Sequence, residues 1–190
     1  MRLFSLTNKT ALVTGASSGL GQHFAHVLAD AGAYVVLAAR RLDRLEEVAE
    51  SIEKRGGKAL PVQMDVTSDD SVTGAFAEIR EALGRPCDVL DNNSGISGEG
   101  WFWAMPEKDW DTVIETNLTG VWRVAKYATK AMIDAGCGGA IINIASITAL
   151  RPSNMISAYS ASKAAVDHLT RTMALEASRH GIRVNAIAPG

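Results

Sequence analysis

Short, continuously apolar segments alternate with longer amphipathic segments along the whole 190-residue chain. Residues 10–14 and 34–39 are typical of buried strands, whereas residues 42–55 place apolar side chains at helical spacing. Strands that are apolar throughout and separated by helices indicate a parallel sheet covered on both faces. We therefore expect an α/β fold with a doubly wound, Rossmann-like parallel sheet. The pattern predicts strands at 10–14, 34–39, 60–64, 88–92, 140–144 and 183–187, and helices at 19–31, 42–55, 69 to about 83, 110–117, 118–135 and 159–180.

The composition suits one globular domain, residues 1–190, that is large enough to bury a continuous core. The net charge of −2 comes without a concentrated basic face, which argues against a nucleic-acid partner. No apolar run approaches the roughly 18 residues of a bilayer span, and no signal-peptide pattern follows Arg2. Cys87 and Cys137 are far apart and not at metal-ligand spacing. A disulfide is one alternative, but we favour two reduced thiols in a cytoplasmic protein without a metal site.

A glycine-rich segment lies between the first predicted strand and the first predicted helix. It reads Thr-Gly-Ala-Ser-Ser-Gly-Leu-Gly over residues 14–21. Gly15 permits a tight turn, Gly19 lets the backbone approach a pyrophosphate, and Gly21 lets the helix pack closely on the sheet. The free backbone N–H groups and the positive dipole end of the helix favour phosphate at this point. The junction therefore predicts a dinucleotide site rather than a simple turn.

Polar side chains suited to proton transfer follow the later strands. Tyr159 and Lys163 are one helical turn apart, so a phenol and an ammonium group share one helix face. Ser146 follows the fifth predicted strand, and the sequence Asn-Asn-Ser-Gly at 92–95 ends the fourth. Asn117 lies at the end of the helix predicted at 110–117. Because doubly wound sheets bind ligands at the carboxyl ends of their strands, we expect these side chains to lie along one edge.

Taken together, these motifs resemble the short-chain dehydrogenase/reductase family, in its single-domain branch. The resemblance covers essentially the whole chain and keeps the family's order of motifs. In sequence order they are T-G-A-S-S-G-L-G, Asp65-Val66, N-N-S-G, Asn117, Ser146, Y-S-A-S-K, Asn185 and Pro189-Gly190.

The resemblance implies an oxidoreductase that transfers a hydride between a nicotinamide cofactor and a ketone or secondary alcohol. Tyr159 would be the general acid/base, Lys163 would favour the phenolate and hold the nicotinamide ribose, and Ser146 would hydrogen-bond the substrate oxygen. Asn117 would hold a water that relays protons from Lys163. The residues expected to bind the cofactor are Gly15, Ser17, Ser18, Gly19, Leu20, Gly21, Arg40, Asp65, Val66, Asn92, Ser94, Gly95, Tyr159, Lys163, Pro189 and Gly190.

The end of the second strand bears on the choice of cofactor. An NAD site places Asp or Glu there, which accepts hydrogen bonds from the adenosine ribose hydroxyls. This chain has Ala39 instead, followed by Arg40 and Arg41. A guanidinium group matches a 2′-phosphate, which NAD lacks. We therefore expect NADP, and regard NAD as the less favoured cofactor.

Two features depart from the pattern or admit several interpretations. Asp91 occupies a position in the fourth strand that is usually aliphatic, and an unpaired buried carboxylate is costly. We interpret it as a structural group with a local hydrogen-bond partner rather than as a catalytic acid.

Trp101, Trp103 and Trp110 cluster after that strand. Three interpretations are open for these side chains: a wall of the substrate pocket, contacts between subunits, or ordinary packing in the core or on the surface.

Two other functions compete with the enzyme hypothesis. One is a non-catalytic dinucleotide-binding sensor or scaffold of the same fold. The other is an epimerase or dehydratase of the extended branch, which has a different glycine spacing and a longer substrate domain. Because Asn117, Ser146, Tyr159 and Lys163 occur together, the enzyme is favoured.

The family resemblance also implies an assembly and a longer chain. A homodimer or homotetramer is expected through the helices at 118–135 and 159–180, which present Val121, Ala125, Ala128, Ala164, Ala165 and Leu169. A seventh strand and a mobile substrate lid normally follow the Pro-Gly turn. We therefore expect the sixth strand to form an apolar sheet edge, and a natural protein longer than 190 residues, which intact mass measurement tests.

Overall fold

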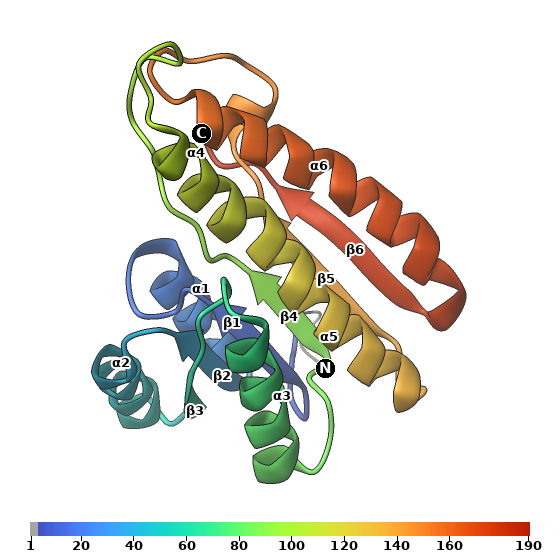
Figure 1. The fold of residues 1–190 in the computed structure, drawn as a ribbon. Helices are drawn as coiled ribbons and strands as arrows, with labels where there is room; N and C mark the ends of the chain where they lie inside the picture. The colour runs from blue at the N-terminus through green and yellow to red at the C-terminus, as the bar shows by residue number, and fades with distance from the viewer. Residues whose placement is uncertain (1–3) are drawn as a thin grey trace.

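A computed structural model describes residues 4–190 and contains one six-stranded parallel sheet (Figure 1). The strand order is β3-β2-β1-β4-β5-β6. The order reverses between β1 and β4, which defines a doubly wound α/β sheet. The predicted fold class is confirmed, and β6 lies at one edge of the sheet, as expected. The strands are β1 (Thr10–Thr14), β2 (Tyr34–Ala39), β3 (Lys58–Gln63), β4 (Val89–Asn92), β5 (Gly139–Ile144) and β6 (Ile182–Ile187).

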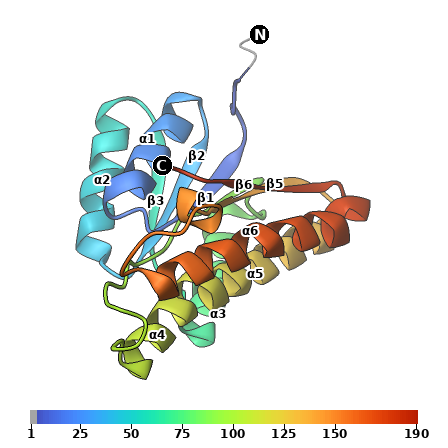
Figure 2. The ribbon, with the colours of Figure 1, turned by 90° about the horizontal axis from the view of Figure 1, so that it is seen from above.

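Helices cover both faces of the sheet, and Figure 2 shows α1 and α2 on one side and α3, α5 and α6 on the other. Each layer buries its own apolar cluster against the strands. The helices are α1 (Gly19–Asp30), α2 (Leu42–Lys54), α3 (Asp69–Leu83), α4 (Glu107–Ile114), the π-helix η1 (Glu115–Thr119), α5 (Gly120–Asp134), the short 3₁₀ helices η2 (Ile147–Ala149) and η3 (Ser178–His180), and α6 (Ser157–Ala177).

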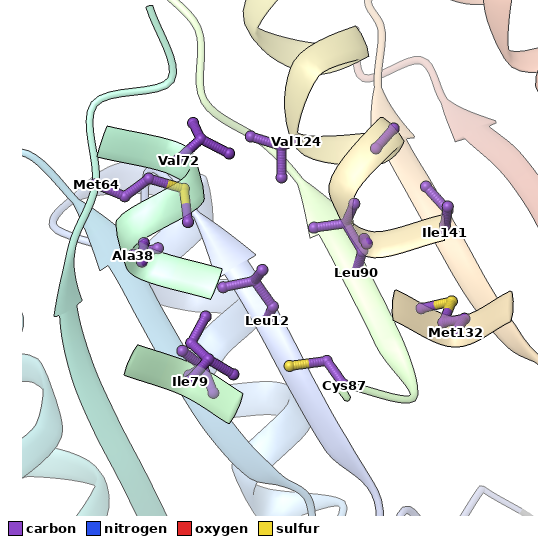
Figure 3. Close-up of a cluster of buried hydrophobic side chains, with 14 of the residues drawn as sticks. Leu12, Ala38, Met64, Val72, Ile79, Cys87, Leu90, Val124, Met132 and Ile141 are labelled. Atoms are coloured by element: carbon purple, nitrogen blue, oxygen red, sulfur yellow. The ribbon is translucent and has the colours of Figure 1, made fainter. Parts of the chain in front are cut away.

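The larger cluster packs α3 and α5 onto the central strands (Figure 3). Leu12 and Leu90 project from β1 and β4, and meet Ile79 of α3 and Val124 of α5; all four side chains are at most 2% exposed. Close packing of this kind holds the carboxyl ends of β1, β4 and β5 in a fixed arrangement. The loops that leave those strand ends therefore start from a rigid platform.

Several element boundaries differ from the sequence predictions, and three of the differences change how an element is built. β3 begins at Lys58 and includes Pro61, which is tolerated because β3 is an edge strand. The helix predicted at 110–117 begins earlier, at Glu107, directly after Pro106. It also runs without a break through η1 into α5, where two separate helices were predicted. A π-turn inserts an extra residue into a helix, and such turns are frequent at functional sites.

Asp91 is buried at the centre of the sheet. It pairs in register with Val13 of β1 and Ile142 of β5, and is 4% exposed. Its Oδ1 has no hydrogen-bond donor among residues 4–190, so the local partner that we expected for this atom is not there. Burial raises the pKa of the Asp91 carboxyl to about 7. The expected burial of Asp91 is confirmed.

Residues 4–190 contain neither a membrane-spanning helix nor a metal-binding cluster of side chains. No helix there is long and apolar enough to cross a bilayer. No group of three or more His, Cys, Asp or Glu side chains lies close enough together to hold a metal ion. Cys87 is buried and Cys137 is exposed, and both are free thiols.

Candidate active site and cofactor cleft

A cleft runs along the carboxyl ends of the strands and has two connected cavities. The first, of about 410 Å³, is lined by Arg40, Arg41 and Asp65 among others, and we call it the arginine-side cavity. The second, of about 370 Å³, contains Tyr159 and Lys163, and we call it the tyrosine-side cavity. Both are lined by Gly15, Ser18, Ser94, Gly95 and Ile96, so the glycine-rich turn and the end of β4 form their common wall.

The glycine-rich turn between β1 and α1 depends on its glycines in two ways. Gly15 and Gly19 have φ angles of +66° and +58°, which side-chain-bearing residues rarely adopt. A Cβ on Gly21 would collide with the carbonyl oxygen of Gly15, so only glycine lets α1 pack at this distance. A Cβ on Gly19 would meet no atom within 4 Å. The turn therefore leaves its backbone N–H groups open to a phosphate at the start of α1.

The arginine-side cavity brings together the turn and the residue after β2. The guanidinium of Arg41 donates to the hydroxyl of Ser17 at 3.1 Å and lies 3.5 Å from that of Ser18. Arg40 lines the same cavity. Two cations and two hydroxyl groups at one end of the cleft suit a phosphate group. Sequence reasoning selected Arg40 but not Arg41, although the two are adjacent.

Asp65 is oriented by its own loop. Its Oδ1 accepts from the backbone N–H of Thr67 at 3.0 Å and from the Thr67 hydroxyl at 2.8 Å. The backbone N–H of Asp65 donates to the hydroxyl of Ser71 on α3. Val66 follows and also lines the cavity. These contacts hold the Asp65 carboxylate at the wall of the cavity.

The tyrosine-side cavity is lined by Ser146, Tyr159 and Lys163, which were expected to lie along the carboxyl edge of the sheet. Lys163 is 3% exposed and its Nζ donates to the carbonyl of Ile144 at 2.6 Å. Nζ lies 5.7 Å from the centre of the Tyr159 ring. Burial lowers the pKa of the Lys163 ammonium to about 8. The Ser146 hydroxyl accepts from the backbone N–H of Thr148, and Ser146 is 7% exposed.

Asn117 lies inside the π-helix η1 and is fully buried. Its Nδ2 donates to the carbonyl of Ile96 and to the hydroxyl of Ser162, and its Oδ1 accepts from the backbone N–H of Ile96. The side chain thereby ties the loop after β4 to α6. Ser162 in turn donates to the carbonyl of Tyr159 at 2.7 Å. Sequence reasoning did not select Ser162, which sits within the Y-S-A-S-K motif.

Several residues selected from the sequence do not line either cavity. Asn92 points to the opposite side, where its Nδ2 donates to the carbonyl of Val121 at 2.8 Å. Neighbouring residues of a strand face opposite sides, so Asn93 lines the tyrosine-side cavity instead. Asn117, Gly19, Gly21 and Gly190 lie outside both linings, whereas Leu20 and Pro189 line the tyrosine-side cavity.

An exposed aromatic group lies on the loop between β4 and α4. The rings of Trp101 and Trp103 stack with their centres 5.0 Å apart, and Phe102 meets Trp103 edge-on. All three are at least 45% exposed, so they do not serve core packing. Gly100 donates its N–H to the carbonyl of Met155, which joins this loop to the segment before α6 (Figure 1).

Comparison with known proteins places this site in a family. The sequence profile described as "short chain dehydrogenase" matches residues 9–190. The chain belongs to the short chain dehydrogenase family. Among its curated relatives, the gluconate 5-dehydrogenase of Gluconobacter oxydans is 40% identical over 188 residues, covering 99% of this chain and 73% of the relative.

Solved structures of short chain dehydrogenases share the fold closely. A short-chain type dehydrogenase/reductase from Mycobacterium marinum has a TM-score of 0.95 at 44% identity, covering 99% of this chain and 74% of that one. A gluconate 5-dehydrogenase from Burkholderia cenocepacia, solved with NADP and tartrate, has a TM-score of 0.94 at 35% identity, covering 98% and 72%. The chain thus spans about three quarters of the length of these relatives.

Proposed function

We propose that this short chain dehydrogenase is an oxidoreductase that transfers a hydride between NADP(H) and a ketone or secondary alcohol. The observation that carries the proposal is the joint placement of Ser146, Tyr159 and Lys163 around one cavity, next to the glycine-rich turn. Incubating the protein with NADPH and a panel of ketones tests it, with loss of reduced-nicotinamide absorbance as the signal. Because two relatives act as gluconate 5-dehydrogenases by name, 5-ketogluconate belongs in that panel.

The nicotinamide ring, when bound, supplies or accepts the hydride. The residues of the chain manage the proton and the oxygen. The Tyr159 phenol gives its proton to the carbonyl oxygen in reduction and takes it back in oxidation. The Ser146 hydroxyl donates a hydrogen bond to that oxygen as negative charge develops on it. Lys163, whose pKa is lowered to about 8 by burial, exchanges a proton near neutral pH and so resupplies Tyr159.

The residues of the cleft fit a dinucleotide phosphate. The N–H groups at the start of α1 face the pyrophosphate, beside the turn that Gly15 permits. We propose Arg40 and Arg41 as the ligands of the adenosine 2′-phosphate, with Ser17 and Ser18 beside them. Asp65 and Val66 would bind the adenine, and Ser94, Gly95 and Pro189 would lie along the nicotinamide side.

Arg40→Ala and Arg41→Ala are each expected to weaken NADPH binding about tenfold, because a hydrogen bond to a charged partner contributes roughly that much. NADH lacks the 2′-phosphate, so its affinity should stay within about twofold. Equilibrium titration of each variant with both cofactors measures this. Arg44→Ala is the matched control, since Arg44 forms an exposed pair with Glu47. Equal affinity of the native protein for NADH and NADPH would contradict the assignment.

The non-catalytic sensor remains the competing function, and the grouping of Ser146 and Tyr159 with Lys163 argues against it. Burying an ammonium group is costly, and among residues 4–190 the Lys163 ammonium donates a hydrogen bond only to the carbonyl of Ile144. A protein that only bound a dinucleotide would use Lys163 to hold the ribose, but would have little need of the Ser146 and Tyr159 hydroxyls in the same cavity. An extended-branch epimerase is disfavoured by the glycine spacing of the turn.

We also propose that the protein assembles through α5 and α6, although only some of the residues first selected, Leu169 among them, lie on the outer face of these helices. Val121, Ala125 and Ala128 are at most 3% exposed because they face the sheet of their own chain. The outer faces of α5 and α6 instead form a groove of about 660 Å³ that includes Trp122, Ile133 and Leu169. Trp122 is 44% exposed, and such a groove suits a second copy of the chain.

Sedimentation velocity at micromolar concentration is expected to show a dimer or tetramer of the native protein. Trp122→Glu should shift it to monomer, because a carboxylate buried in an interface without a partner is costly. Val27→Glu adds the same charge at an exposed apolar position of α1 and should leave the assembly intact. A native monomer at this concentration would contradict the proposal.

Residues 1–190 are further proposed to act as a single dinucleotide-binding domain, supported by the single sheet that spans them. A cytoplasmic location is proposed from the two free thiols, since a reducing compartment keeps cysteines in this state.

A further inference from the structure

Arg123 lies on α5 behind the cofactor cleft, with its side chain only 12% exposed. Its Nη1 donates to the backbone carbonyl of Val66 at 2.5 Å, and its Nη2 pairs with Oε1 of Glu115 at 2.8 Å. Asp69 is a more distant partner, with Oδ1 3.8 Å from Nε. Because the guanidinium is planar and rigid, an arginine bonded to two segments fixes their relative position.

The two close partners of Arg123 belong to two separate segments that contribute residues to the arginine-side cavity. Val66 lines the cavity from the loop between β3 and α3. Glu115 is the first residue of η1 and directly precedes Thr116, which lines the same cavity together with Thr112. Arg123 therefore joins both segments, without lining the cavity itself.

Packing around Arg123 leaves these segments little freedom. A Cβ on Gly120 would lie 2.8 Å from Cγ2 of Val66, so the Val66 loop rests directly on the first turn of α5. The hydroxyl of Tyr127, one turn beyond Arg123, donates to Asp69 at 2.9 Å and holds the start of α3 against α5. Two hydrogen bonds thus hold the loop that carries Asp65: one from the Thr67 N–H to the Asp65 carboxylate, and one from Arg123 to the carbonyl of Val66.

We propose that Arg123 is a positioning residue for the adenine half of the cofactor. By bonding Val66 and Glu115 it sets the width of the arginine-side cavity, and so the place at which Asp65 and Val66 meet the adenine. It acts through these two residues and does not touch the cofactor. The inference rests on the proposed function, since it takes this cavity as the adenosine site.

Binding of 2′,5′-ADP tests the proposal, because this ligand carries the adenosine half and no nicotinamide. Arg123→Met is expected to weaken its binding about tenfold in calorimetric titrations and to raise the KM of NADPH similarly. The kcat at saturating NADPH should stay within about twofold, since the catalytic groups are untouched. Arg123→Lys, which cannot bond both partners in the same plane, should show an intermediate loss.

Glu115→Gln should weaken 2′,5′-ADP binding in the same direction, and its effect should vanish in the Arg123→Met background, because both changes break one link. Glu115 is 42% exposed, so this variant and Arg123→Lys carry the comparison if Arg123→Met does not fold. Arg171→Met is the matched control, because Arg171 forms an exposed pair with Asp167 on α6. It should leave every parameter unchanged.

Two results would overturn the inference alone. The first is an Arg123→Met protein that binds 2′,5′-ADP within twofold of the native protein. The second is an equal fall in 2′,5′-ADP affinity and in kcat at saturating NADPH, which would indicate general loosening of the fold. A native protein that binds no 2′,5′-ADP would instead overturn the cofactor assignment, and this inference with it.

Discussion

Tyr159→Phe is expected to lower kcat/KM for a reducible ketone by about 10³-fold, the scale of general acid catalysis. The substitution removes only the hydroxyl that would protonate the carbonyl oxygen. The ring keeps its place one helical turn from Lys163 on α6. NADPH affinity, measured by fluorescence titration, should change by no more than a few-fold, because the phosphate-binding turn is untouched.

Tyr34→Phe is the control for this experiment. It removes the same phenol hydroxyl at the amino end of β2, away from the cleft, and should leave turnover unchanged. A Tyr159→Phe protein that keeps more than about a tenth of native activity would show that another group donates the proton.

The second large effect concerns stability. Asp91→Val is expected to raise the free energy of unfolding at pH 8 by about 2–4 kcal/mol, because one pKa unit corresponds to ~1.4 kcal/mol. The folded-state pKa of Asp91 is raised from 3.8 to about 7. The folded protein therefore binds this proton more tightly than the unfolded chain, and native stability falls as pH rises between those two values. The gain from Asp91→Val should accordingly be smaller at pH 5 than at pH 8.

Asp88→Asn provides a control of opposite sign. Partial burial acts to raise the pKa of Asp88, but the hydrogen bond from the Thr10 N–H and the cations Lys9 and Arg85 together hold it below its usual value. Asp88→Asn should therefore destabilise the protein at neutral pH, with a loss that fades in acid as the native carboxyl protonates. Urea unfolding at pH 5 and pH 8 measures Asp91→Val, and unfolding at pH 8 and well below pH 3.8 measures Asp88→Asn. A destabilised Asp91→Val protein would mean that Asp91 makes a favourable interaction.

Local features of the sequence were enough to predict most of the fold and the core of the candidate site. The continuous apolar runs at residues 10–14 and 34–39 predicted buried strands, and their alternation with helical segments predicted a parallel sheet. The four-residue spacing of Tyr159 and Lys163 put both on one helix face, and the family resemblance assigned them to the same cavity as Ser146. These features depend on period and spacing within one element, which the sequence states directly.

Contacts between distant segments were decided by the tertiary structure alone. The two-residue alternation of side chains along a strand predicts that Asn92 and Asn93 face opposite sides of the sheet, but it does not say which side holds the cleft. Helical periodicity identified one apolar stripe on α5, yet only packing against the sheet showed that Val121 faces the core and Trp122 the surface. Arg123 meets Val66 from 57 residues away. A residue's spacing sets the face on which it lies, but the partner on that face depends on how the elements pack.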